Sequence, residues 1–353
     1  MKSGVLKLGC QSGPSTDGHF AFLARFGVRH VCASPVIEEA GRLCPTVEEL
    51  RRLRQMAERH GLALEMTDSV LLRSTLIDDE KHPAIMLGAS PERDRDIESF
   101  RQLLRNCAAV GIGTVKYNMS LLGVVRNRNE SGRGGVSYSG WKAGADECAP
   151  PLTRAGEVDE STYWERIRYF LERVVPVANE CKVRIACHPH DPGLPAEGYR
   201  GVQCVLGSVA GLDRFLDIAE SPYHGLNFCQ GTVCSQLQRP ANEIFDVIRH
   251  FGARGKIFNV HIRNIRGHRG DFVETFPDDG DIDMLRAIKT YREVGYDGML
   301  MPDHVPLLPL QRAGDPYAYN YGLETSAADG HRESFAFAYG YLRGLLQASE
   351  SAS

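Results

Sequence analysis

The stretch that decides the fold spans residues 256–306 and reads KIFNVHIRNIRGHRGDFVETFPDDGDIDMLRAIKTYREVGYDGMLMPDHVP. Its apolar runs at 257–262 and 298–301 predict two strands, and the segment between them holds a long polar loop followed by a helical pattern. Strands joined by a helix are parallel, because a right-handed crossover returns the chain to the start of the next strand. The two strands therefore end side by side, and their ends carry His261 and Asp303, which can bind a metal ion or move a proton.

The same alternation of short apolar runs and helical patterns continues along the whole chain. It is typical of repeated βα units that form a parallel sheet. The predicted strands are residues 5–11, 30–34, 62–67, 114–119, 184–188, 225–229, 257–262 and 298–301. The predicted helices are residues 17–26, 45–60, 93–109, 163–179, 210–219, 241–251, 282–294 and 332–346, with Asp17 as the N-cap of the first. This count predicts a (β/α)8 TIM barrel, formed by one domain that spans residues 1–353.

Two segments fall outside the repeat. The polar, glycine-rich connection at about 123–160 is long for a loop of a compact domain, so we expect it to be functional or mobile. Its sequence SGRGG at 131–135 lacks the lysine of a phosphate-binding P-loop, which favours a flexible lid. The C-terminal sequence SESAS, residues 349–353, predicts a short disordered tail.

Charge and composition narrow the class of partner. The chain has 41 Lys and Arg against 45 Asp and Glu, and this net charge of −4 argues against a nucleic-acid or polybasic membrane surface. No apolar run approaches the ~20 residues of a membrane span, and the N-terminal residues lack the apolar core of a signal peptide. Ten scattered cysteines without a CxxC pair are expected to be mostly buried, reduced thiols. We therefore expect a cytoplasmic protein with a small-molecule partner.

Four consecutive predicted strands end in a residue that can bind a metal ion. They are His188, Cys229, His261 and Asp303. Each such residue alone is more often part of the hydrogen-bonded or buried structure. In a barrel, however, all four side chains meet at the C-terminal face, where the reactive groups of such barrels lie. We expect a divalent metal there: Mn²⁺ or Fe²⁺ suits oxygen-rich chemistry, and a thiolate also accepts Zn²⁺ or Co²⁺.

Candidates for proton transfer follow the last strand. His304 comes directly after Asp303, and Tyr317, Tyr319 and Tyr321 lie in the sequence PYAYNYGL of the next loop. Histidine and tyrosine both serve as general acids and bases. The alternative role of the tyrosines is to pack a lid over the site.

Other polar residues near the strand ends suit a substrate with carboxylate and hydroxyl groups. Lys116 and Asn118 lie on one face of the fourth predicted strand, where a buried structural pair is the alternative. His190 extends the turn after the fifth strand, where its other possible role is to orient His188. Arg263 begins a basic cluster, which in an acidic protein favours binding of an acidic sugar over nucleic acid.

Six stretches together carry a family resemblance. They are VKYNM at 115–119, CHPHDPG at 187–193, SPYHGLNFCQG at 221–231, VHIRN at 260–264, GDIDM at 280–284 and MPDH at 301–304. On these stretches the chain resembles the mannonate dehydratases, a metal-dependent branch of the xylose-isomerase-like barrels. The similarity covers most of the barrel in the right order, and the SPYxGLxFCxG and HIRN segments are its most specific parts.

The resemblance implies a chemistry for the site. It implies a metal, Mn²⁺ first and Fe²⁺ next, held by the same four strand-end residues, with His304 and Tyr321 in proton transfer. It further implies a hydro-lyase of hexuronate catabolism that converts D-mannonate to 2-keto-3-deoxy-D-gluconate, and we expect a homo-oligomer. The alternatives are dehydration of a related aldonate, sugar isomerisation or epimerisation on the same barrel, and a barrel that only binds a sugar or a partner.

Two stretches depart from the usual pattern of that family. The turn after the fifth strand reads HPHDPG rather than HPDDPP, so His190 replaces an acidic residue. The last strand leads into MPDHV rather than RPDHG, so Met301 replaces an arginine. The missing arginine could position either the substrate or Asp303, so we expect Met301 to be the first place where a changed substrate shows.

Overall fold

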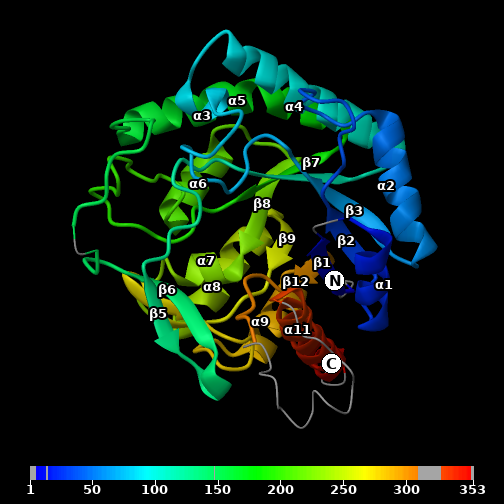
Figure 1. The fold of residues 1–353 in the computed structure, drawn as a ribbon, viewed down its shortest axis with the longest axis vertical. Helices are drawn as coiled ribbons and strands as arrows, with labels where there is room; N and C mark the ends of the chain where they lie inside the picture. The colour runs from blue at the N-terminus through cyan, green and yellow to red at the C-terminus, as the bar shows by residue number, and fades with distance from the viewer. Residues whose placement is uncertain (1–4, 13–14, 147, 309–326, 351–353) are drawn as a thin grey trace.

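The parallel strands close into a barrel (Figure 1). The computed structural model describes residues 5–12, 15–146, 148–308 and 327–350. Neighbouring strands run in the order β1, β12, β9, β8, β7, β4, β3, β2, and every neighbouring pair is parallel. Their bounds are β1 Lys7–Ser12, β2 His30–Ala33, β3 Ala63–Asp68, β4 Thr114–Asn118, β7 Arg184–His188, β8 His224–Cys229, β9 Ile257–His261 and β12 Met299–Met301. The predicted (β/α)8 barrel is thereby confirmed.

Helices cover the outside of the barrel (Figure 1). Their bounds are α1 Asp17–Arg25, α2 Val47–Arg59, α3 Ala84–Leu87, α4 Glu92–Val110, α5 Glu160–Cys181, α6 Val209–Asp217, α7 Gln230–Cys234, α8 Pro240–Ala253, α9 Met284–Glu293 and α11 Ala327–Glu350. Helix α2 begins with a capping box, in which Thr46 Oγ1 accepts from the Glu49 backbone N–H and the Glu49 carboxylate accepts from that of Thr46. The predicted cap of α1 was wrong: Thr16 is the N-cap, and Asp17 is the first helical residue.

The long connection at 123–160 is not a simple loop. It contains a hairpin of β5 (Arg128–Ser131) and β6 (Ser137–Lys142), and the sequence SGRGG leads through the hairpin turn. Strand β6 pairs with β11 (Asp271–Glu274), which pairs with β10 (Ile265–His268), so a four-stranded antiparallel sheet forms beside the barrel. This pairing joins the 123–160 segment to the chain that follows β9.

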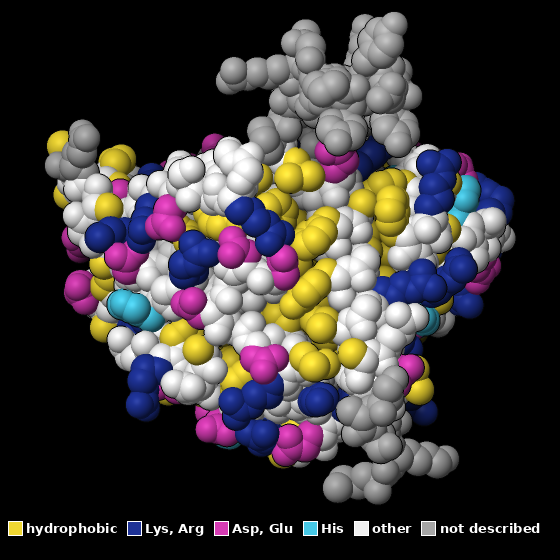
Figure 2. All heavy atoms as spheres, turned by 90° about the horizontal axis from the view of Figure 1, so that it is seen from below, with side chains coloured by type: hydrophobic (Ala, Val, Ile, Leu, Met, Phe, Trp, Pro, Cys, Tyr) yellow, Lys and Arg dark blue, Asp and Glu magenta, His cyan; other side chains and the backbone are white. Residues whose placement is uncertain are grey.

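The C-terminal helix extends further than the sequence indicates. Ser349 and Glu350 belong to α11, and residues 351–353 of the predicted tail lie outside the described residues. Figure 2 views the molecule from the side of α11, where a band of hydrophobic side chains runs between groups of charged ones. Within the described part of the chain, the helices are all too short or too polar to cross a membrane.

A buried histidine at the start of β8 makes the fold sensitive to acid. His224 is wholly buried, its Nε2 donates to the Phe215 carbonyl at 3.1 Å, and its ring lies 4.7 Å from that of Phe215. Burial lowers the pKa of His224 from 6.5 to about 4. Since the unfolded chain takes up the proton first, this stabilisation is present above pH 6.5 and is lost as the pH falls to about 4.

We expect wild-type protein to lose roughly 3 kcal/mol more stability between pH 7 and pH 4 than His224→Gln does, because each unit of pKa shift corresponds to about 1.4 kcal/mol. Glutamine keeps an N–H donor for the Phe215 carbonyl but does not titrate. Urea unfolding at a series of pH values measures the difference. Stability curves that run parallel for the two proteins would contradict the assignment.

Candidate metal centre and active site

The four strand-end residues converge at the C-terminal mouth of the barrel. His188 ends β7, Cys229 ends β8, His261 ends β9 and Asp303 follows β12 by two residues. The register pairs Cys229 with His261, and one ligand atom from each of the four residues lies within 4.8 Å of all the others. Parallel strands in register therefore bring together four groups that lie far apart in the sequence.

The two histidines present different ring nitrogens to this cluster. His188 Nδ1 donates to the Pro189 carbonyl at 2.6 Å, which leaves Nε2 unprotonated, and burial lowers the pKa of His188 to about 4. His261 Nε2 contacts Asn227, so Nδ1 faces the cluster, 3.5 Å from Asp303 Oδ2. Nδ1 of His261 is buried and makes no hydrogen bond. A buried nitrogen without a partner beside a thiol and a carboxylate fits a metal ligand.

Neighbouring side chains also contact the other two candidate ligands, Cys229 and Asp303. Thr232 donates from Oγ1 to Cys229 Sγ at 3.0 Å, which fixes the position of the sulfur atom. Burial acts to raise the pKa of Asp303, but His304, His261 and Arg263 hold it well below its usual range. The residues present thus fit a divalent ion with mixed nitrogen, sulfur and oxygen ligands.

A second cluster of charged groups lies directly beside the first. Arg263 is 2% exposed, and its guanidinium contacts Asp191 at 2.8 Å and Glu274 at 2.7 Å. Arg126 contacts the same two carboxylates. His304 donates from Nδ1 to Glu274 Oε1 at 2.9 Å and also lies against Arg263. The two arginines occupy the space between the carboxylates, so this cluster positions His304 instead of binding a cation.

The contacts within this second cluster determine the charges of its side chains. The two arginines hold the pKa of Asp191 well below its usual range and lower that of Glu274 to about 2, although burial acts to raise both. Burial acts to lower the pKa of His304, but Asp303 and Glu274 raise it to about 9. His304 also has φ of 47°, a left-handed conformation that costs energy for a residue other than glycine.

The other half of the barrel mouth is polar. Lys116 donates from Nζ to Gln11 Oε1 at 2.7 Å, and Asn118 lies at the end of the same strand β4. All three residues line a cavity of about 90 Å³ together with candidate ligands His188, His261 and Asp303. Lys116 and Asn118 therefore lie where we predict substrate contacts.

The other two predicted substrate residues have their polar groups engaged. His190 Nδ1 contacts the Pro192 carbonyl at 2.9 Å, and Nε2 lies 3.4 Å from Cys204 Sγ. Arg263 is taken up by the charged cluster described above. His190 also lines the cavity, and its contacts are compatible with its alternative role of orienting His188. The ion pairs of Arg263 instead favour a role in positioning neighbouring groups of the site.

Met301 does not lie at the substrate cavity. It is fully buried inside the barrel, in a cluster of Cys32, Met66, Ala186, Phe258 and Met299. Its side chain packs in the barrel interior and does not line the cavity, so Met301 could change the substrate only indirectly. The candidate Tyr321, with Tyr317 and Tyr319, lies outside the described residues.

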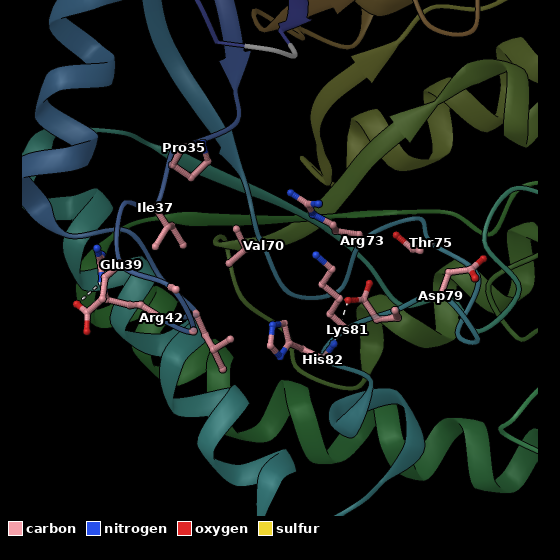
Figure 3. A pocket seen from close by; sticks show the side chains of 14 residues that line it. Pro35, Ile37, Glu39, Arg42, Val70, Arg73, Thr75, Asp79, Lys81 and His82 are labelled. Atoms are coloured by element: carbon pink, nitrogen blue, oxygen red, sulfur yellow. Dashed lines mark hydrogen bonds and ion pairs between the residues drawn. The ribbon is translucent and has the colours of Figure 1, made fainter.

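A second cavity opens beside the first. It has a volume of about 380 Å³, and its lining includes Arg73, Thr75, Lys81 and His82 from the segment after β3 (Figure 3). Ser74, between Arg73 and Thr75, lines the metal-site cavity. The two cavities thus lie on either side of one short stretch of chain.

Several residues of the site were not predicted from the sequence. Thr232 lies three positions after Cys229 in the first turn of α7, and this short spacing was a usable signal. Arg126 and Glu274 carried no such signal, because only the pairing of β6 with β11 brings their segments together. Gln11 and Asn227 reach the site through the closure of the barrel and the pairing of β8 with β9.

Known structures share this fold. Mannonate dehydratase from Streptococcus suis serotype 2 superposes with a TM-score of 0.79 at 23% identity, over 99% of this chain and 95% of the other. A xylose isomerase domain protein from Alicyclobacillus acidocaldarius gives 0.59 at 13% identity, over 98% and 99%. The fold is therefore that of the xylose-isomerase-like (β/α)8 barrels.

Sequence comparison gives the family. The profile of D-mannonate dehydratase (UxuA) matches residues 24–139 and 136–330. Mannonate dehydratase of Thermotoga neapolitana is 30% identical over 82% of this chain and 86% of its own length. Mannonate dehydratase 2 of Halalkalibacterium halodurans is 30% identical over 83% and 88%. The chain belongs to the D-mannonate dehydratase family and is a hydro-lyase.

We expect Arg263→Met to destabilise the protein by about 3–5 kcal/mol, because it leaves Asp191 and Glu274 buried with one arginine, Arg126, between them. The control is Arg128→Met on the small sheet, whose partly exposed ion pairs should contribute less than about 1 kcal/mol. Urea unfolding of both variants provides the measurement. Equal losses of unfolding free energy in the two variants would show that the buried cluster stabilises the protein no more than the exposed ion pairs do.

Proposed function

We propose that this hydro-lyase dehydrates D-mannonate to 2-keto-3-deoxy-D-gluconate and that it depends on a divalent metal. The observation that carries the proposal is the convergence of His188, Cys229, His261 and Asp303 beside His304, in a chain of this family. We take Mn²⁺ as the first candidate and Fe²⁺ as the second. We keep the expectation of a cytoplasmic homo-oligomer.

Removal of a proton beside a carboxylate is difficult, since negative charge develops on the acid as the C2–H bond breaks. A divalent ion held by the four ligands would supply Lewis-acid stabilisation of that charge. The protein must then accept the C2 proton and give a proton to the departing C3 hydroxyl. We assign these two transfers to His304 and Tyr321 together.

The contacts of His304 support this role. Glu274 accepts from its Nδ1, so the ring orientation is fixed and Nε2 remains, 3.6 Å from Asp303 Oδ1. The imidazole is thus held next to the candidate ligands with one nitrogen available to the substrate. On β4, the strand next to that of His188, Lys116 and Asn118 would bind the hydroxyl groups.

Purified protein loaded with Mn²⁺ should convert D-mannonate to a 2-keto-3-deoxy acid with the loss of one water. A panel of other aldonates, tested in parallel with Fe²⁺, Co²⁺ and Zn²⁺, defines the substrate and the metal. Mass spectrometry of the product is the measurement. A product of unchanged mass would replace dehydration with isomerisation or epimerisation, and no product with any ion would reject the proposal.

Two variants should separate metal binding from proton transfer. Cys229→Ser should lose most of the bound metal, because serine is a poor substitute for a thiolate ligand. His304→Asn should keep the metal but lower kcat by about 10²–10⁴-fold, the usual contribution of a general acid or base. Metal analysis and steady-state kinetics of both variants test this. Wild-type kcat in His304→Asn would exclude that residue from the chemistry.

A further inference from the structure

A short stretch of chain, residues 72–77, lies between the two cavities and is fixed against the segment that follows β4. The Asn118 backbone N–H donates to the Leu72 carbonyl at 2.7 Å, and the Ile77 N–H donates to the Leu121 carbonyl at 2.9 Å. Asn118 also lines the cavity at the candidate ligands. The stretch therefore has a set position relative to the candidate metal site.

The backbone of this stretch has little freedom to move. Leu72 has φ of 56°, a left-handed conformation that costs energy for leucine. On the facing segment, a Cβ at Gly123 would lie 2.8 Å from the Leu76 nitrogen and 3.0 Å from the Ser74 oxygen, so the close approach requires glycine. The stretch is thus a rigid support for Arg73, which follows Leu72 directly and lines the wider cavity.

Two basic side chains on the wider cavity have no acidic partner. Arg73 and Lys81 are exposed, and neither forms an ion pair with another residue that the structure describes. In Figure 3 both head groups point into the cavity. The neighbouring Arg42, by contrast, is bonded to Glu39 and Glu49. The cavity therefore keeps two positive charges that are available to a ligand.

The acidic residues of the same lining do not neutralise these two charges. Glu39 is paired with Arg42 at 3.4 Å, and the Glu80 carboxylate accepts from the His82 backbone N–H at 3.2 Å. Figure 3 shows Asp79 pointing away from the two free cations. A carboxylate or phosphate group is the ligand that a guanidinium and an ammonium bind best when they share one space.

We propose that the wider cavity binds a second anionic group, a carboxylate or a phosphate, at the far end of a sugar acid. The first carboxylate of this acid lies at the candidate ligands, its hydroxyl chain crosses Ser74, and the far group pairs with Arg73 and Lys81. The substrates that bind best are then doubly charged sugar acids. The inference deepens the proposed function and rests on it, because the same site carries out the same dehydration.

The test compares D-mannonate with D-mannarate, which has a carboxylate at C6, and with 6-phospho-D-mannonate. Isothermal titration calorimetry on Mn²⁺-loaded His304→Asn gives the dissociation constants, because this variant should bind the acids with little conversion. Both doubly charged acids should bind about 10–100-fold more tightly than D-mannonate, as charge-assisted hydrogen bonds usually contribute. Adding Arg73→Met or Lys81→Met should remove most of this preference. The matched control Arg168→Met, which changes an exposed arginine on α5, should retain it.

Equal affinities for the three acids would overturn the proposal, and so would a preference that survives both Arg73→Met and Lys81→Met. Inorganic phosphate is the fourth ligand. If it binds through Arg73 while the three acids bind alike, the cavity is a separate anion site and the proposal fails.

Turnover by the wild type separates this inference from the proposed function. Dehydration of D-mannonate together with equal affinities for the three acids would reject the inference alone. If none of the three acids is dehydrated, the proposed function fails, and the binding preference still decides whether the wider cavity takes the second anionic group.

Discussion

The buried guanidinium of Arg263 is the interaction on which the rest of the site depends. It follows β9 and contacts four other segments: the turn after β7 through Asp191, α7 through Thr232, β11 through Glu274, and the end of β12 through His304. A buried arginine is stable only with several acceptors around it, so each of these segments is restricted to one position. The same contacts support a candidate ligand and a candidate proton-transfer residue, because Thr232 also reaches Cys229 and Glu274 also reaches His304.

The antiparallel sheet beside the barrel completes this arrangement. Strand β11 brings Glu274 to the site only because β6 pairs with it, and the stretch just before β5 supplies Arg126 to the same carboxylates. The 123–160 segment thus contributes to the site of its own chain, and it does so through strand pairing and not as a loose cover. A loop without this sheet would have to order itself each time the site formed, at a cost in conformational entropy.

Local patterns predicted much of this molecule. Alternation of strands and helices predicted the barrel, and because parallel strands end at one face, the strand-end residues His188, Cys229, His261 and Asp303 could be grouped from their positions along the chain alone. Contacts between distant segments were not accessible in this way. The sheet that carries Glu274 depends on pairing across about 130 residues, and the burial of Met301 depends on the packing of the barrel interior. An arginine-rich stretch after β9 likewise suggested a binding surface, whereas Arg263 is buried and forms ion pairs with Asp191 and Glu274.

The division of the barrel mouth restricts how a sugar acid can lie in it. The candidate ligands come from β7, β8, β9 and the end of β12, while Gln11 and Lys116 come from β1 and β4, the strands that flank this group in the barrel. On the proposed function, the carboxylate end of the substrate lies at the ion and its hydroxyl chain extends toward Lys116. A wider cavity of about 380 Å³, lined by Arg73 and Lys81, lies beside Ser74, which itself lines the smaller cavity at the candidate ligands. If the far end of the hydroxyl chain extends in that direction, selectivity among sugar acids depends on the wider cavity, because the metal end of the site is common to all of them.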